Sequence, residues 1–165
     1  MRPLVAACFV LLVACTPRTP LPEPPAGLST IAVAAVENRT GDDLVVSGDN
    51  VVARWLKRPK RTVPDVLRED LRRALEGRGL TVADGGNMPT LRVVLRRFEP
   101  DVPQLTWVEV ALGAQVVDPD GTVRWDAERS SWLVPVRGAP SLEVAYESAA
   151  RDVARALVDG WRRAE

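Results

Sequence analysis

The sequence predicts a single α+β domain in which two helices pack on one face of an antiparallel sheet of about four to five strands, in the order β-α-β-β-β-β-α. Two observations support this fold class. Two segments repeat apolar residues with helical spacing, and several other segments alternate apolar and polar residues as half-buried strands do. The chain has 165 residues, of which 46% are hydrophobic, so it is long enough to bury one real core.

Five segments are typical of strands. Residues 30–36 form a continuous apolar run, which favours a central strand. The other four strands are expected at 80–82, 91–98, 105–117 and 122–136. Residues 37–61 are irregular, and a small hairpin from 44–46 to 51–53 would fit part of this stretch.

Both helices have recognisable ends. The first is expected over 62–78, because Thr62 can cap it, Pro64 suits its first turn and Gly79 can end it. The second is expected over 141–163. One side of each helix is apolar and would face the sheet. These two stripes are Val63, Val66, Leu67, Leu71, Ala74 and Leu75, and Leu142, Tyr146, Ala149, Ala150, Val153, Leu157 and Trp161.

The last two strands are joined by the turn Asp118-Pro119-Asp120-Gly121, which allows two registers. A two-residue turn places Ala114 opposite Trp125, and likewise Val116 opposite Val123 and Leu112 opposite Ala127. It also pairs Trp107 with Trp132 on the exposed face. A three-residue loop with a bulge at Gly121 would instead set Trp132 against Val108. We favour the first register, because a slip of one residue moves a whole face of the strand.

The Trp107–Trp132 pair of the favoured register would be an exposed aromatic surface for a partner or a lipid. The alternative is that a neighbouring loop covers these side chains.

A second candidate contact surface is a basic segment with two large apolar side chains and no acid. Its residues are Arg54, Trp55, Leu56, Lys57, Arg58, Pro59, Lys60 and Arg61. One interpretation is a solvated loop. The other is contact with anionic headgroups or with an acidic partner, since each basic residue near a charged leaflet contributes about 1 kcal/mol.

The N-terminus is typical of an exported protein. A positive start at Arg2 is followed by an apolar run over 4–13, which is too short to span a bilayer and suits a signal peptide of residues 1–14. The run ends in Leu12-Val13-Ala14-Cys15, which resembles the lipobox of bacterial lipoproteins. An alternative box ending at Cys8 leaves too short an apolar run before it.

The lipobox resemblance implies that the Cys15 thiol carries a diacylglyceryl group and that the new N-terminus is acylated, with palmitate as the expected fatty acid. Several buried acyl chains give a firm membrane anchor. Thr16 in place of an aspartate favours the outer membrane, facing the periplasm. Residues 16–28 hold five prolines, so 15–28 are expected to form an extended tether and 29–165 the periplasmic domain.

Several function classes are disfavoured. Histidine is absent, and both cysteines lie within the first 15 residues, so the sequence indicates no catalytic residue, metal or cofactor. Lys plus Arg equals Asp plus Glu at 22 each, which argues against nucleic acid as a partner. Asp118 and Asp120 fit a plain turn better than a calcium loop, and Glu69-Asp70 is expected on the solvated side of its helix.

Taken in order, the lipobox, residues 50–55, the helix 63–75, the strand 91–98, the turn 118–121 and the alanine-rich C-terminal helix resemble the transport-auxiliary lipoprotein family. Its members accompany ABC-type, MCE-containing lipid transporters at the outer membrane. The resemblance implies an accessory protein that binds a partner and is not an enzyme. Residues 37–40, Glu-Asn-Arg-Thr, are more similar to lipoproteins that assist lipopolysaccharide assembly or activate cell-wall synthases.

Overall fold

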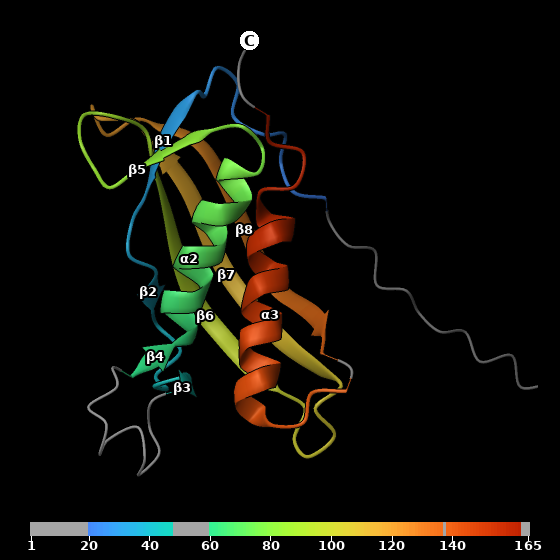
Figure 1. Cartoon of the computed structure of the whole chain (residues 1–165). Helices are drawn as coiled ribbons and strands as arrows, with labels where there is room; N and C mark the ends of the chain where they lie inside the picture. The colour runs from blue at the N-terminus through green and yellow to red at the C-terminus, as the bar shows by residue number, and fades with distance from the viewer. Residues whose placement is uncertain (1–19, 48–59, 137, 163–165) are drawn as a thin grey trace, which may run out of the picture.

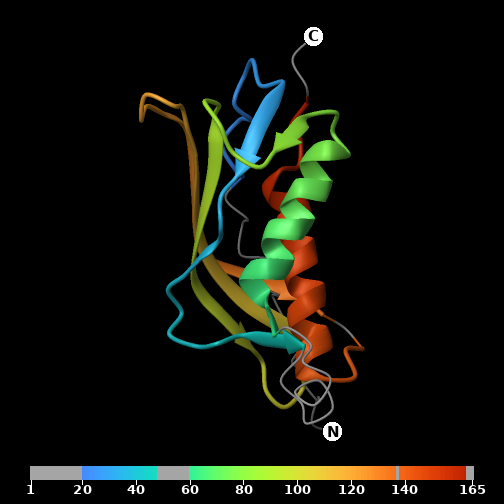
Figure 2. The same ribbon diagram turned by 60° about the vertical axis from the view of Figure 1, so that its left-hand side comes forward.

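The computed structural model describes residues 20–47, 60–136 and 138–162. Within these ranges the chain forms an α+β sandwich: a twisted sheet makes one layer, and two helices lie side by side on one of its faces (Figures 1 and 2). The hydrophobic core fills the space between the two layers. The predicted fold class and the two-helix layer are therefore confirmed.

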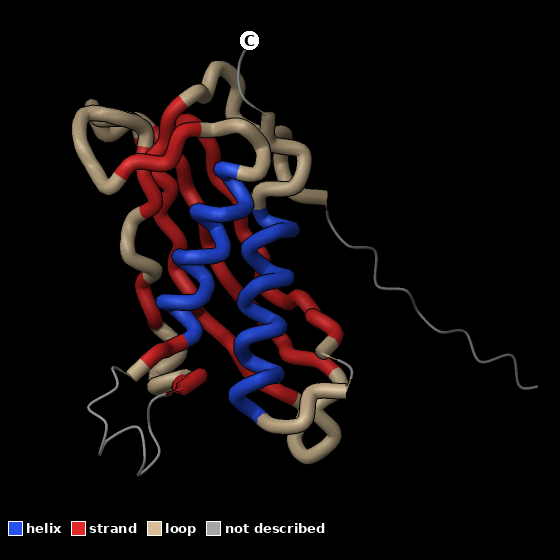
Figure 3. The backbone as a smooth tube through the Cα atoms, in the orientation of Figure 1, coloured by secondary structure: helices blue, strands red, loops and turns tan. Residues whose placement is uncertain are grey.

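The main sheet has the strand order β5-β1-β6-β7-β8, and the short strand β2 (Glu37–Asn38) pairs with the middle of β6, at Val94 and Leu95. The bounds of the other strands are β1 Thr30–Val33, β5 Thr81–Ala83, β6 Thr90–Pro100, β7 Trp107–Val117 and β8 Val123–Pro135. Three of these, β6 to β8, form a long antiparallel meander (Figure 3).

The prediction of a purely antiparallel sheet is wrong, because β1 runs parallel to both of its neighbours, β5 and β6. The chain passes from β1 to β5 through a helix, and such a crossover returns the next strand in the same direction. The sheet is therefore mixed, with six strands in place of the predicted four or five.

Three short strands, β2 to β4, add to the predicted element order. The strand β3 (Val45–Ser47) pairs antiparallel with β4 (Arg61–Thr62) in a separate two-stranded sheet. The predicted hairpin partner of 44–46, residues 51–53, lies outside the described residues.

The first helix, α2 (Val63–Glu76), begins one residue after the predicted start, with Thr62 as the predicted N-cap, and ends two residues earlier than predicted. The N–H and the hydroxyl of Thr62 both donate to the Asp65 carboxylate, at 2.9 and 2.7 Å. The predicted apolar stripe of α2 is buried, except for Ala74, which is half-buried. The placement of Asp70 on the solvated side is wrong, because this residue is only 6% exposed.

The second helix, α3 (Leu142–Leu157), is shorter than the predicted 141–163. It ends because the chain turns at Gly160, whose φ is +84°. Trp161, predicted to lie in the helical stripe, is buried beyond the end of the helix and meets Trp125 edge-on, with ring centroids 5.1 Å apart. Leu142, at the other end of the predicted stripe, is exposed.

The favoured register of the β7–β8 hairpin is wrong. The loop has three residues: the N–H of Asp118 donates to the carbonyl of Thr122 at 2.8 Å, and Gly121 has a φ of +90°. This is the bulged turn that Pro-Asp-Gly chemistry favours. Consequently Val117 pairs with Val123, not Val116 with Val123.

Two further register shifts follow along the hairpin. The first, between Val116 and Val117, moves Ala114 opposite Ala127 and turns Trp125 toward the core. It thereby restores the burial of the alternating face that a single bulge would have exposed. The second lies between Val110 and Leu112, so the predicted partnership of Leu112 with Ala127 also fails.

Candidate functional site

Most of the predicted contact residues cannot be placed. Cys15, Arg54, Trp55, Lys57 and Arg58 lie outside the described residues. The lipidation site and the greater part of the basic segment therefore remain sequence predictions.

Lys60 and Arg61, at the C-terminal end of that basic segment, both take part in ion pairs. Lys60 pairs with Asp43. Arg61 donates to Glu69 at 2.6 Å and to Glu147 at 3.4 Å. Burial lowers the pKa of Arg61, but the hydrogen bond and charge of Glu69, together with Glu147, outweigh it and raise the pKa above its usual value.

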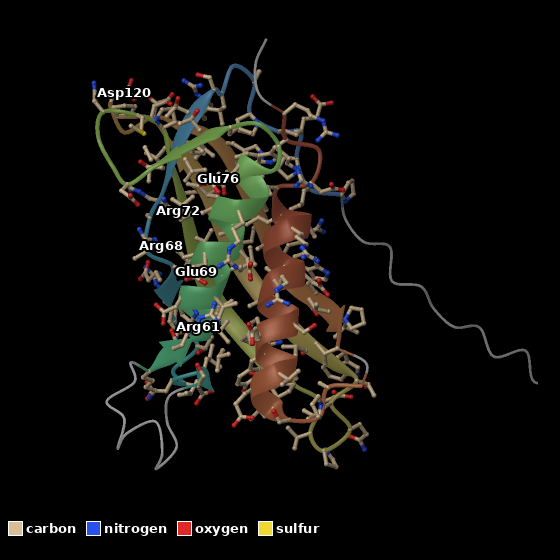
Figure 4. The ribbon with its side chains drawn as sticks, viewed as in Figure 1. Arg61, Arg68, Glu69, Arg72, Glu76 and Asp120 are labelled. Atoms are coloured by element: carbon tan, nitrogen blue, oxygen red, sulfur yellow. The ribbon has the colours of Figure 1, made fainter. Side chains whose placement is uncertain are left out.

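The Arg61 contacts belong to a closed ring of six alternating charges that joins β4, α2 and α3. Figure 4 labels two of its members, Arg61 and Glu69. Its successive contacts are Arg61–Glu69 at 2.6 Å, Glu69–Arg73 at 3.4 Å, Arg73–Asp70 at 3.0 Å, Asp70–Arg151 at 3.7 Å, Arg151–Glu147 at 3.0 Å and Glu147–Arg61 at 3.4 Å. Three arginines balance three carboxylates, so the ring ties β4, α2 and α3 together without net charge. This arrangement has a structural role.

The predicted exposed pair of Trp107 and Trp132 does not form. Trp107 lies opposite Pro135, and Trp132 lies opposite Val110 and packs, half-buried, against the core. The three-residue loop and the two register shifts together move Trp132 from opposite Trp107 to opposite Val110, three positions along β7. The prediction of an aromatic contact surface at this pair is wrong.

The segment before the first strand lies against the domain. Leu28 is only 2% exposed, and Leu21 packs against the core cluster. The side chain of Pro24 approaches Gly160, just after α3. We call residues 21–28 the docked segment. A tether that was expected to be extended over 15–28 is thus held against the folded body over its second half.

The sheet face away from the helices carries a shallow depression of about 370 Å³. We call this side of β6, β7 and β8 the open face. Gly113 lies in the middle of β7 between Val94 on β6 and Glu128 on β8. Because Gly113 has no side chain, the guanidinium of Arg96 lies over it and pairs with Glu128.

Period-two alternation in the predicted strands already placed Arg92, Val94 and Arg96 together on one side. A glycine in the interior of a strand, here Gly113, often marks a close approach by another group. These two signals could have found the open face. They do not reveal which strands adjoin.

Farther along the open face, Glu109 accepts hydrogen bonds from Ser131 at 2.8 Å and from Arg97 at 2.9 Å. The Ser131 hydrogen bond has the largest effect on its pKa. Together with the hydrogen bond and charge of Arg97, it outweighs burial and holds the pKa of Glu109 below its usual range. A carboxylate kept ionised in this way is suited to binding and poorly suited to general acid chemistry.

The Glu37-Asn38-Arg39-Thr40 motif organises its own turn. Glu37 pairs with Arg39 at 2.6 Å. The Asn38 side-chain oxygen accepts from the N–H and the hydroxyl of Thr40 at 3.1 and 2.8 Å, and its amide donates to the carbonyl of Asp42 at 2.7 Å. The motif therefore has a local structural role at the end of β2.

The predicted turn function of Asp118 and Asp120 is confirmed. Asp120 lies at the tip of the β7–β8 hairpin and accepts from the N–H of Thr122 at 2.9 Å (Figure 4). Asp118 pairs with Arg124 at 3.0 Å. Across the described ranges, no group of three or more His, Cys, Asp or Glu residues is placed to hold a metal ion. No helix in the described part of the chain has the length and hydrophobicity to cross a bilayer.

No family model matches the chain, and no curated protein matches it in sequence. Among solved structures it is similar to protein XCC0632 from Xanthomonas campestris, of the family DUF330, with a TM-score of 0.54 and 20% identity over 82% of this chain and 86% of that one. A dodecamer of PelC from Paraburkholderia phytofirmans gives a TM-score of 0.48 and 13% identity over 82% and 91%. The first likeness establishes a shared fold alone, and the second is too weak to support a structural conclusion.

Proposed function

We propose that the protein is a lipid-anchored, non-catalytic accessory component of envelope lipid transport. It would be attached through acylated Cys15 to the outer membrane and would bind a protein partner in the periplasm. The observation that carries the proposal is the docked segment, considered together with the lipobox. It determines how far from a membrane the folded body could act.

The distance available to the anchor is short. Leu21 and Leu28 pack against the domain, so the free chain extends from Cys15 to Pro20 at most. In a polyproline conformation these five steps span about 16 Å, whereas a tether free to residue 28 would span about 40 Å. The domain would therefore remain close to the leaflet that holds it.

This short reach favours an accessory role beside a lipid pathway at the membrane surface. The alternatives are regulation of a cell-wall synthase and assistance to lipopolysaccharide assembly. A regulator of a synthase in the opposite membrane needs a long tether to reach its target, and the docked segment removes most of that length. Lipopolysaccharide assembly was suggested by residues 37–40, whose contacts form a local turn.

The chemistry of the surfaces supports binding. Glu109 on the open face accepts hydrogen bonds from Ser131 and Arg97, which hold it as a carboxylate that can meet a cationic group. Balanced charges on the open face suit recognition of a polar surface more than catalysis.

The anchor is tested by mass spectrometry and fractionation of the protein from its native cell. We expect loss of residues 1–14, a diacylglyceryl thioether at Cys15, and recovery with membranes. Replacement Cys15→Ser should abolish acylation and release the protein, whereas the matched control Cys8→Ser should change neither. A free Cys15 thiol with the leader still attached would overturn the envelope placement.

The transport role is tested by crosslinking the acylated protein in intact cells and identifying the partner by mass spectrometry. An MCE-containing protein or its permease as the crosslinked partner would support the proposal. A cell-wall synthase or a lipopolysaccharide-assembly protein would overturn it in favour of the corresponding alternative. Genes for an MCE protein and a permease beside this one would agree with the first outcome.

A further inference from the structure

Around Gly113, the charges on the open face are sorted by strand. The cations Arg92 and Arg96 belong to β6, and the acids Asp126 and Glu128 belong to β8. Between them β7 contributes two uncharged residues, Gly113 and Gln115, and its charged residue on this face, Glu109, lies farther along and is paired with Arg97. One cross-strand row runs Arg92, Gln115, Asp126, and the next runs Val94, Gly113, Glu128, with Arg96 beside it.

The first row is free to bind another molecule. Arg92, Gln115 and Asp126 are all exposed, and neither charged group has an ion-pair partner within the described part of the chain. Neighbouring strands lie about 4.8 Å apart, so the backbones of β6 and β8 are separated by about 10 Å. Gln115 occupies the space between the two charges.

We infer that the open face binds a second copy of this chain, face to face, about a twofold axis parallel to β7. This rotation exchanges the β6 side with the β8 side. Arg92 of one copy then faces Asp126 of the other, and Arg96 faces Glu128. Gln115 lies on the axis and faces its own counterpart.

Charge complementarity singles out a second copy. A twofold interface is self-complementary, so a surface can use it only if its cations meet its own acids after rotation. The separation of Arg92 and Arg96 from Asp126 and Glu128, across the uncharged Gln115 and Gly113, satisfies this condition in both rows. Two amides that meet on the axis, as at Gln115, can each donate and accept.

The shape of the face is compatible with this packing. Two sheets pack at about 10 Å, and their inner side chains must interdigitate. Gly113 and the depression of about 370 Å³ around it leave room for arginine side chains from both copies. Arg96 can exchange its own Glu128 for the partner's with little change in its surroundings.

Because the face is polar, we expect weak association in free solution. A charged interface contributes more to register and specificity than to affinity. Anchoring would change the balance, since two copies held on one leaflet have a high effective concentration. This last step rests on the proposed attachment at Cys15, whereas the contact surface itself does not.

The geometry is tested by site-specific crosslinking, because the chain has no cysteine after Cys15. Gln115→Cys lies on the axis and should react with its counterpart through a short bis-maleimide. Glu37→Cys is a matched control on the same face. It lies two strands from β7, so its two copies would be about 20 Å or more apart and should not react.

Charge exchange then tests the pairing. In the Gln115→Cys chain, Arg92→Asp alone or Asp126→Arg alone should lower the crosslinked fraction at least fivefold. The two together should restore it to within twofold. Arg155→Asp, on the outer side of α3, should change nothing. Circular dichroism checks that each variant is folded, which is expected because all these side chains are exposed.

The crosslinking is done with the acylated chain in vesicles and with mature Cys15→Ser chain in solution. The solution experiment is run at the bulk concentration of the vesicle experiment and again at a higher one. Crosslinking on vesicles should exceed that in solution at least tenfold at equal bulk concentration. If Cys15 proves not to be acylated, the solution experiment still tests the contact. The inference fails if Gln115→Cys does not crosslink, if Glu37→Cys crosslinks equally, or if the double exchange does not restore the product.

Discussion

The two faces of the β6–β8 meander share one backbone and differ in the burial and the polarity of their side chains. On the covered face, Leu91, Leu95, Leu112 and Val116 are fully buried under α2 and α3. On the open face, the neighbouring positions include the charged Arg92, the amide Gln115 and Gly113, which has no side chain. Side-chain direction alternates along a strand, so each face can change without altering the other.

This difference separates stability from recognition. Burial of apolar surface is the main favourable term in folding, so the covered face determines whether the domain folds. The open face contributes little to folding and is free to carry the sorted charges of Arg92 and Asp126. The same separation gives quantitative expectations for each region.

The largest effect is expected on the covered face. Leu112→Ala removes a fully buried side chain from the centre of β7 and should lower the free energy of unfolding by about 2–5 kcal/mol. Gln115→Ala, three residues along on the open face, should change it by less than about 0.5 kcal/mol. Urea denaturation measures both. Equal losses would contradict the division between the faces.

Removal of a charge from the ring on the helix layer should lower the free energy of unfolding less than Leu112→Ala does. Asp70→Asn keeps the shape of a side chain that is 8% exposed but removes its charge from contacts with Arg73 and Arg151. Hydrogen bonds to charged groups contribute about 1.5–3 kcal/mol when partners are well ordered, and both arginines are partly exposed, so a loss of about 1.5 kcal/mol is expected. The exposed pair of Arg155 and Asp152 gives the control: Arg155→Ala should cost less than about 0.5 kcal/mol. A loss for Asp70→Asn no larger than this control would contradict a stabilising role for the ring.

A substitution in the loop of the β7–β8 hairpin should lower the free energy of unfolding by a smaller amount still. Gly121 has a φ of +90°, and a side chain there costs about 1 kcal/mol. Gly121→Ala should therefore lower the free energy of unfolding by about that amount. Gly121→Asn should lose less, because asparagine tolerates positive φ better. Thermal unfolding of both variants checks this ranking, and a neutral Gly121→Ala would contradict the bulged loop.

The smallest expected effect is on the stability of the protein at acidic pH, through Glu109. The pKa of Glu109 is lowered in the folded protein, so its contribution to stability is complete above its usual pKa and is lost as pH falls through the lowered value. Glu109→Gln should reduce the loss of stability that occurs as pH falls from the usual range of a glutamate through the lowered pKa. Ser131→Ala removes the main hydrogen-bond donor and should raise the pKa of Glu109 toward its usual range, as carboxylate NMR titration would show. An unchanged pH profile in both variants would contradict the assignment.

Much of the fold could be predicted from particular residues. Thr62, Pro64 and the apolar stripe through Leu67 and Leu71 identified α2, and alternation identified β6, β7 and β8. The chemistry of Gly121 indicated the correct loop, but the favoured register overlooked it for the sake of burial. The two requirements were compatible, because the register shift between Val116 and Val117 keeps the three-residue loop and still buries the alternating face.

The contact surfaces were harder to predict. The proposed Trp107–Trp132 pair depended on a single register over the whole hairpin, and two bulges removed it. Asp70 was predicted to face solvent because the sequence of a helix does not show which other element packs against it. Arg151, which contacts it, is 81 residues away along the chain.

The sequence by itself determined the local elements, the alternation that makes one sheet face apolar, and the lipobox pattern at Cys15. Those features depend on residues a few positions apart, whose backbone preferences and side-chain directions are set locally. Only the tertiary structure decided that β1 runs parallel to β5 and β6, that residues 21–28 dock on the domain, and that Arg92 and Asp126 share a row. Such contacts join distant segments, and they depend on how the whole core packs and on every bulge between them.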